Sequence, residues 1–313
     1  MYRIAITLIC VVTHSISAMS QDNTIQLRDG RLLGFAEYGR PDGIPFIYFH
    51  GGQESRLSSC FMDSVAAELG IRIISPERPG IGLSTFQPNR TFLDWASDIE
   101  DLANCLNIDS FSVFGLSGGA PHVLACLQVI PTRIVNASII AGAAPYDYDG
   151  SLKGMWLPVK IIHWFASMKS DKLLRKFIEK DAEDLVQAPE KRIKQFQNYL
   201  PNPDKTLMKN QPEYGWDFIE GSREAYQQGV DGVVQEWQLY VADWHIDLSA
   251  IQQRITLWYG AEDKMAPYHR GRYYQKHLPN AHLHEIKDEA HFSLIRTHLK
   301  EILLELRTTK KDK

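Results

Sequence analysis

Short, mostly apolar runs that alternate with helical segments constrain this 313-residue chain more than any other feature. The runs are 45–49, 71–75, 111–114, 134–141 and 255–259, and a further strand is expected at 282–286. Helical spacing follows between them, in 59–69, 92–106, 121–129, 268–277 and 292–306. Such runs are typical of strands buried on both faces, and their alternation with helices is typical of a parallel sheet. We therefore predict an α/β fold with a mostly parallel central sheet flanked by helices.

The first strands and the middle of the chain depart from this alternation. Asp29-Gly30 separates two extended runs, 24–28 and 31–38, which indicates a hairpin. Residues 146–245 have helical spacing and hold five of the seven tryptophans. Because the sheet pattern resumes afterwards, we expect a core domain formed by 21–145 and 246–313, interrupted by a helical cap at 146–245.

The N-terminus has the pattern of a secretory signal peptide. Arg3 precedes an apolar run, Ile4–Val12, and small and polar residues follow. The run has roughly half of the about 20 apolar residues that a membrane-spanning helix needs. A positive start, a short apolar core and small residues predict cleavage after residue 17 or 20. We expect an exported protein, periplasmic or secreted, and a cytoplasmic one if residues 1–20 are not a signal.

Charge and cysteine content exclude two classes of protein. Lys and Arg total 34 against 38 for Asp and Glu, a net charge of −4, so no basic excess points to nucleic acid. Four cysteines in a chain of this length do not form a disulfide framework. Cys60, Cys105 and Cys126 lie in apolar helical contexts, and we expect buried free thiols.

The segment Gly115-Leu116-Ser117-Gly118-Gly119 carries the strongest chemical signal. It lies between the apolar run 111–114 and the helical segment 121–129, the setting that a G-x-S-x-G nucleophile elbow requires. Such a turn lifts the serine hydroxyl above the end of the strand. The start of the following helix supplies backbone N–H groups and the positive end of a dipole. Ser117 is therefore the predicted nucleophile.

A serine needs a base, and the base needs an orienting acid. His291 follows the strand at 282–286 and is the predicted base, and Asp263 follows the strand at 255–259 and is the predicted acid. Both would lie at the carboxyl ends of strands, where open α/β sheets bind ligands. Glu262 and Asp147 remain as alternative acids.

A glycine pair after another strand completes the predicted site. In His50-Gly51-Gly52-Gln53, the Gly52 N–H would pair with the Gly118 N–H as an oxyanion hole. Donors of this kind contribute about 3 kcal/mol each. The glycine-bearing loop 76–84 contains Ser84 outside any G-x-S-x-G pattern, so we interpret it as a structural wall of the site.

Several histidines near the C-terminus raise the alternative of a metal site. His282 and His284 alternate along one strand, and His291 and His298 follow. No carboxylate or cysteine lies at a familiar ligand spacing. Surface or helix-capping roles fit better, and we expect neither a metal nor a cofactor.

Taken together, these motifs resemble those of the α/β-hydrolase superfamily, in its serine esterase and lipase-like branch. The matching segments are His50-Gly51-Gly52, Arg78-Pro79-Gly80-x-Gly82-x-Ser84, Gly115–Gly119, Gly260-x-x-Asp263 and His291-Phe292. Apart from the insertion, the resemblance extends from about residue 27 to about residue 306. It implies a helical cap over the site. Glu289-Ala290 departs from relatives that carry glycine before the histidine, which affects the local loop shape.

The resemblance also narrows the reaction. Haloalkane dehalogenases and epoxide hydrolases of this fold use an aspartate at the elbow, and proline iminopeptidases carry a tryptophan-containing elbow, whereas this chain has Ser117. We expect hydrolysis of a carboxylic ester or related acyl bond through an acyl-enzyme on Ser117. A C–C bond hydrolase, an acyltransferase and a non-catalytic small-molecule receptor are the alternatives.

The substrate is harder to infer from the sequence. The aromatic residues of the insertion favour an apolar acyl or alcohol pocket, although most of them would also serve to pack the cap on the core. They are Trp156, Trp164, Phe165, Trp216, Trp237 and Trp244. The mildly acidic net charge fits a neutral small-molecule substrate. A lipid-facing lid at 155–168 is the less favoured interpretation.

Overall fold

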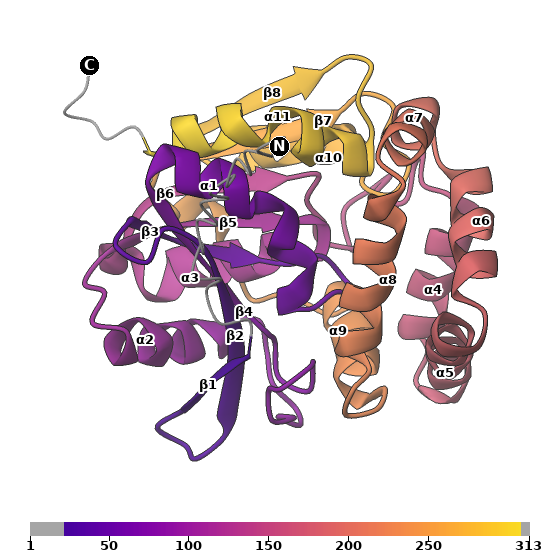
Figure 1. Cartoon of the computed structure of the whole chain (residues 1–313), viewed down its shortest axis with the longest axis horizontal. Coiled ribbons are helices and arrows are strands. Elements are labelled where there is room, and N and C mark those ends of the chain that lie inside the picture. Colours follow the sequence, from indigo (N-terminus) through magenta and orange to yellow (C-terminus); the bar gives the residue numbers. More distant parts are fainter. Residues whose placement is uncertain (1–21, 308–313) are drawn as a thin grey trace, which may run out of the picture.

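A computed structural model describes residues 22–307, which form an eight-stranded sheet flanked by helices (Figure 1). The strand order is β1-β2-β4-β3-β5-β6-β7-β8. The strands are β1 Asn23–Gln26, β2 Leu32–Gly39, β3 Ile44–Phe49, β4 Ile71–Pro76, β5 Phe111–Leu116, β6 Ile134–Ile140, β7 Ile255–Gly260 and β8 Ala281–Ile286. Only the pairs β1–β2 and β2–β4 are antiparallel. The predicted signal peptide at 1–20 lies outside the described residues.

Helices cover both faces of the sheet, as the apolar strands require. Along β3, Ile47 and Phe49 point into one hydrophobic cluster while Phe46 and Tyr48 point into the other. The first cluster includes residues of α2 Trp95–Cys105, α3 Ala120–Val129 and α10 His269–His277. The second includes residues of α1 Asp63–Leu69 and α11 His291–Arg307. The predicted fold class is confirmed.

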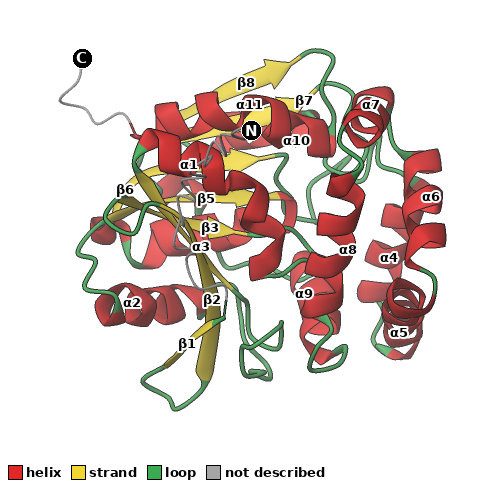
Figure 2. Cartoon of the chain, viewed as in Figure 1, coloured by secondary structure: helices red, strands yellow, loops and turns green. Residues whose placement is uncertain are grey.

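Six α-helices lie between β6 and β7. They are α4 Leu157–Ala166, α5 Lys172–Gln187, α6 Pro189–Tyr199, α7 Asn202–Asn210, α8 Glu213–Ala225 and α9 Asp231–Val241. They gather at one end of the sheet (Figure 2). Part of this insertion packs on itself through Ile162, Leu174, Ile178 and Val233. Within residues 22–307, no helix has the length and apolar character needed to cross a membrane.

Two local predictions need correction. The helix expected at 59–69 begins as a 3-10 segment, Arg56–Met62, whose first turn is capped by the Ser55 hydroxyl accepting from the Leu57 N–H, and becomes α-helical from Asp63. The three cysteines of the described chain are free, but only Cys126 is buried. Cys105 is exposed because it lies at the end of the amphipathic helix α2, and Cys60 is half-buried.

Candidate active site

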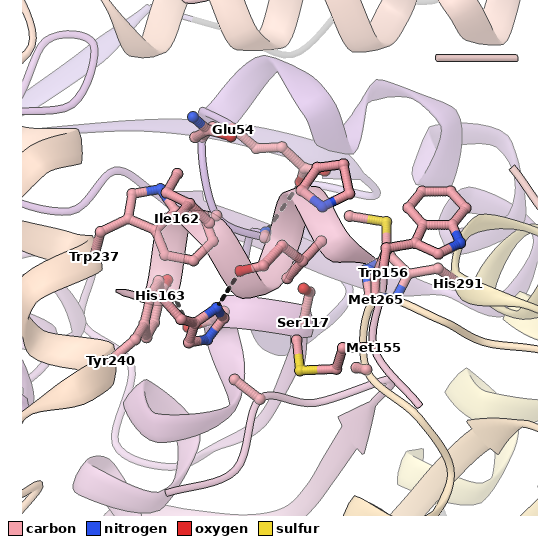
Figure 3. Close-up of a pocket in the computed structure, with 18 of the residues that line it drawn as sticks. Glu54, Ser117, Met155, Trp156, Ile162, His163, Trp237, Tyr240, Met265 and His291 are labelled. Atoms are coloured by element: carbon pink, nitrogen blue, oxygen red, sulfur yellow. Dashed lines mark hydrogen bonds between the residues drawn. The ribbon is translucent and has the colours of Figure 1, made fainter. Parts of the chain in front are cut away.

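The predicted site residues follow different strands and meet at one edge of the sheet. Ser117 follows β5, Gly52 lies just after β3, and His291 follows β8. The carboxyl ends of parallel strands share an edge, which is why residues so distant in sequence meet there. Together with Gly118 they line a cavity of about 250 Å³ between the core and the insertion (Figure 3).

The turn at Ser117 is strained and tightly packed. Ser117 has a φ of 52°, a left-handed conformation that is uncommon outside glycine and recurs at functional sites. Glycine is required beside it. A Cβ on residue 119 would lie 2.2 Å from the carbonyl oxygen of Phe49, and one on residue 118 would lie 2.1 Å from the Tyr240 hydroxyl. The glycines therefore allow the elbow to approach the loop after β3.

His291 and Asp263 form a buried pair. His291 Nδ1 lies 2.8 Å from Asp263 Oδ2. The other carboxylate oxygen accepts hydrogen bonds from the N–H groups of Met265 at 2.7 Å and Ala266 at 2.9 Å. Burial by itself lowers the pKa of His291, but the charge of Asp263 and its hydrogen bond outweigh burial and raise that pKa. The pair has the geometry of a base held by an orienting acid.

The alternative acids are placed elsewhere. Glu262 and Asp147 are both solvent exposed, whereas Nδ1 of the buried His291 ring is already bonded to Asp263. Ser84 has a structural role, because its hydroxyl donates to the Glu77 carbonyl at 2.7 Å and accepts from the Gly34 N–H at 2.9 Å.

The peptide bond between Gly51 and Gly52 is oriented by Arg78. One guanidinium nitrogen donates to the carbonyl of His50 at 2.7 Å, and the other donates to the carbonyl of Gly51 at 2.7 Å. In a planar trans peptide the C=O and the following N–H point in opposite directions. Arg78 therefore turns the Gly52 N–H away from itself.

The Gly118 N–H, the second expected oxyanion donor, is also oriented through a hydrogen bond to the carbonyl of its own peptide. The Ser117 carbonyl accepts a hydrogen bond from the Ala143 N–H at 2.8 Å, so the N–H of Gly118 in that peptide points to the opposite side. This N–H belongs to the first turn before α3, where helices leave N–H groups without an internal acceptor. A Cβ on residue 118 would lie 3.0 Å from the Gly52 nitrogen, so the two donors are neighbours.

A buried ion network joins the insertion to this part of the core. Glu236 of α9 lies 3.0 Å from Arg78 Nε, pairs with Arg90, and lies 2.9 Å from the Tyr240 hydroxyl. Burial alone would raise the pKa of Glu236, but the charges of Arg78 and Arg90 hold it well below its usual range. Two arginines and one glutamate carry a net charge of +1, which favours an oxyanion nearby.

A second contact from the insertion holds the helix that carries His291. Asp204 of α7 is fully buried, and its Oδ1 accepts hydrogen bonds from the N–H groups of Phe292 at 3.0 Å and Ser293 at 2.8 Å. These are among the first N–H groups of α11, which need an acceptor from outside the helix. Burial raises the pKa of Asp204 to about 6.

Sequence reasoning missed Glu236, Asp204 and the role of Arg78. Only Arg78 carried a usable signal, since it lies in a glycine-bearing loop directly after a buried strand. Glu236 and Asp204 lie in helices whose spacing says nothing about which core residues they contact.

His284, one of the histidines that raised the alternative of a metal site, has other partners. His284 pairs with Glu305 at 2.8 Å and stacks on Trp258, with ring centroids 4.0 Å apart. Residues 22–307 contain no group of three or more His, Cys, Asp or Glu side chains that could hold a metal ion.

Of the predicted aromatic residues, only some line the cavity. Trp156 and Trp237 do so. Trp164 and Trp216 are 56% and 43% exposed, and Trp244 is buried in the core cluster. Other aromatic residues complete the lining, among them Phe177, Phe196, Tyr199 and Phe218.

Comparison with solved structures shows that other proteins share this fold. A thermophilic esterase from Thermogutta terrifontis superposes with a TM-score of 0.65 at 18% identity, covering 92% of this chain and all of that chain. An epoxide hydrolase from Vigna radiata superposes with a TM-score of 0.64 at 15% identity, covering 93% of this chain and 97% of that one. At these identities the likeness shows the fold alone.

Sequence comparison finds a proline iminopeptidase of Neisseria gonorrhoeae, 30% identical over 113 residues. The match covers 35% of this chain and 36% of that protein, so the chain spans about a third of the length of this curated relative. Residues 44–296 match the family described as alpha/beta hydrolase fold. This match extends over most of the sequence, and the chain belongs to the alpha/beta hydrolase fold family.

Proposed function

We propose that this protein is a serine hydrolase that cleaves a carboxylic ester, or a related acyl bond, through an acyl-enzyme on Ser117. The observation that carries the proposal is one cavity lined by Ser117, by His291 in its bond to Asp263, and by the two glycines expected to donate to an oxyanion. These are the parts that acyl transfer through serine needs.

The reaction follows from the geometry. The Ser117 hydroxyl attacks the substrate carbonyl while neutral His291 accepts its proton. The negative charge that develops on the carbonyl oxygen is stabilised by the N–H groups of Gly52 and Gly118. Collapse of the tetrahedral intermediate expels the alcohol, which takes the proton from His291. Water, deprotonated by His291, then releases the acid and restores Ser117.

Two features support ester cleavage over the other reactions of this fold. The nucleophile position holds a serine, so the covalent intermediate is an acyl ester rather than the alkyl ester that an aspartate would form. The cavity is lined mainly by aromatic and aliphatic side chains of the insertion, which suits an apolar acyl or alcohol group.

Hydrolysis of p-nitrophenyl esters from acetate to palmitate tests the proposal. We expect turnover of at least one ester by the wild-type protein, and loss of about a thousandfold or more in kcat for Ser117→Ala and His291→Ala. Ser84→Ala is the matched control and should keep its activity, because Ser84 lies outside the cavity lining. Undiminished turnover in Ser117→Ala would contradict the proposal.

The same assay separates the alternatives. Proline β-naphthylamide tests the peptidase activity named for the partial relatives, and added primary alcohols test acyl transfer. A vinylogous 1,5-diketone tests C–C cleavage. Binding of such compounds without turnover would identify a receptor.

A further inference from the structure

Arg270 is a buried cation in the wall of the active-site cavity. It belongs to α10, is 3% exposed, and lines the same cavity as Ser117. Its Nη2 donates to the Ser151 carbonyl at 3.2 Å and lies 3.1 Å from Met155 Sδ. Its Nε is buried without an acceptor. No Asp or Glu within the described part of the chain forms an ion pair with it.

Each of the other buried arginines named above has a carboxylate partner, which makes Arg270 the exception that needs explaining. Arg78 and Arg90 pair with Glu236, and Arg56 pairs with Glu77 at 2.7 Å. Arg192, which is half-buried and lines the same cavity, also has a carboxylate partner, Asp181, at 2.5 Å. A guanidinium keeps its charge in a protein, and burying a charge without a partner is costly.

The groups around Arg270 do not supply a negative charge. His163 lies in the same cavity wall. Burial and the charge of Arg270 lower its pKa to about 4, although the hydrogen bond of its ring to the Val159 carbonyl opposes this shift, so the ring is neutral at neutral pH. Burial raises the pKa of Tyr148, so that hydroxyl is also neutral. Both can donate or accept hydrogen bonds, but neither balances the guanidinium.

The carboxylate of Glu54 also lines the cavity but is held elsewhere. It accepts a hydrogen bond from the Gly51 N–H at 3.0 Å. Figure 3 shows Glu54 above Ser117 and Met155, the neighbour of Arg270, below it. Glu54 is therefore bonded to the loop after β3, whereas Arg270 contacts Ser151 and Met155.

We propose that Arg270 forms a carboxylate-binding subsite, and that the substrate is an ester bearing a free carboxylate beyond the scissile carbonyl. The planar guanidinium suits a carboxylate, with which it forms charge-assisted hydrogen bonds. This inference rests on the proposed function, and it replaces the sequence-based expectation of a neutral substrate. The aromatic lining would enclose the apolar body of such an ester.

Two matched ester pairs test the subsite from both sides of the scissile bond. On the acyl side, p-nitrophenyl hemiglutarate is compared with p-nitrophenyl valerate. On the alcohol side, 4-acetoxybenzoate is compared with 4-acetoxybenzamide. We expect the carboxylate member of one pair to have a kcat/KM higher by about tenfold to a hundredfold, the range of one charge-assisted hydrogen bond.

Arg270→Gln and Arg270→Lys identify the residue responsible. We expect Arg270→Gln to abolish the preference for the carboxylate member of the ester pair, and Arg270→Lys to retain part of that preference. Arg272→Gln is the matched control, because Arg272 lies on the same helix, is exposed, and pairs with Glu285 at 2.9 Å. A preference for the neutral member in both pairs, or a preference that survives Arg270→Gln, would overturn the proposal.

A binding measurement separates failure of the subsite from failure of the proposed chemistry. In the Ser117→Ala background, titration calorimetry with glutarate and with benzoate reports binding without turnover. We expect one of the two acids to bind at least about tenfold more tightly when Arg270 is present than in Ser117→Ala/Arg270→Gln. Equal affinity in both proteins refutes the subsite, whatever the outcome of the ester assays.

Discussion

His291 controls the pH dependence that this site should show. The residue acts as a base only when neutral, so kcat/KM should rise as the pH increases through its pKa. Although burial opposes it, Asp263 raises that pKa above the usual value. The activity of the wild-type protein should therefore begin at a higher pH than an isolated histidine would give.

Asp263→Asn tests this assignment. Without the carboxylate charge the pKa of His291 falls, and the acidic limb of the pH profile should move to lower pH. The rate should fall by about 10⁴-fold, the effect of the same change in a serine protease triad. A profile of kcat/KM from about pH 5 to about pH 9 measures both effects.

Glu262→Gln is the control, since Glu262 is adjacent in sequence but solvent exposed. Glu262→Gln should keep both the wild-type rate and the position of the acidic limb of the pH profile. Full activity in Asp263→Asn would show that another acid orients His291 and would direct attention to Asp147.

Single residues were predictable where strand topology determined their position. Ser117 and Asp263 follow the buried strands β5 and β7, His291 follows the half-buried edge strand β8, and parallel strands bring their carboxyl ends to one edge. Arg270 was not predictable, because its importance lies in the carboxylate that it lacks. The sequence does not show that Arg270 lacks an acidic partner, because the residues that pack around α10 are known only from the structure.

At the level of elements, helix α9 holds the loop after β3, which carries the proposed oxyanion donor Gly52. Glu236 fixes Arg78, and Arg78 fixes two consecutive carbonyls of that loop. Arg78→Lys keeps the charge, but a single ammonium cannot reproduce the planar fork. We predict a fall of about tenfold or more in kcat with little change in KM, because the loop donates only in the transition state.

Arg90→Lys is the matched variant for this prediction. Arg90 pairs with Glu236, as Arg78 does, but no bond from it to the loop carbonyls occurs among the described residues. Steady-state kinetics should therefore show a smaller loss of kcat. Equal kcat values in the two variants would mean that the network acts through stability alone.

Helix α7 holds the start of α11 through Asp204, which predicts a pH-dependent stability. Because the pKa of Asp204 is raised to about 6 from 3.8, the folded state binds its proton more tightly than the unfolded state. Its contribution to stability should thus decrease as the pH rises from about 4 to about 6, by on the order of 2 to 3 kcal/mol.

Asp204→Asn keeps the acceptor oxygen and removes the titration, so urea unfolding at about pH 4 and about pH 7 should show a smaller change than in the wild type. Asp204→Ala should lose about 1 to 3 kcal/mol at both pH values, because two buried N–H groups lose their acceptor. A pH dependence unchanged in Asp204→Asn would refute this role.

Elements of regular periodicity were predicted from the sequence, whereas their ends and contacts were not. The alternating apolar runs gave the strands of the central sheet. The 3-10 segment Arg56–Met62 was not distinguished from an α-helix because, over so short a segment, an i, i+3 repeat fits both types of helix.

The whole molecule is a sheet domain whose site is completed by an insertion. The core supplies Ser117, Asp263 and His291, and the insertion supplies much of the cavity wall together with Glu236 and Asp204. The sequence indicated the insertion by its loss of strand pattern. How it docks depends on buried polar contacts between distant segments, which no local pattern encodes.

Labelling with a fluorophosphonate, followed by tandem mass spectrometry, tests the central claim most directly. The reagent needs an activated serine beside an oxyanion site, and it reports on chemistry for any substrate. We predict one adduct on the peptide that contains Ser117, slower labelling of His291→Ala, and none on that peptide in Ser117→Ala. A folded wild-type protein that leaves Ser117 unlabelled would contradict the account.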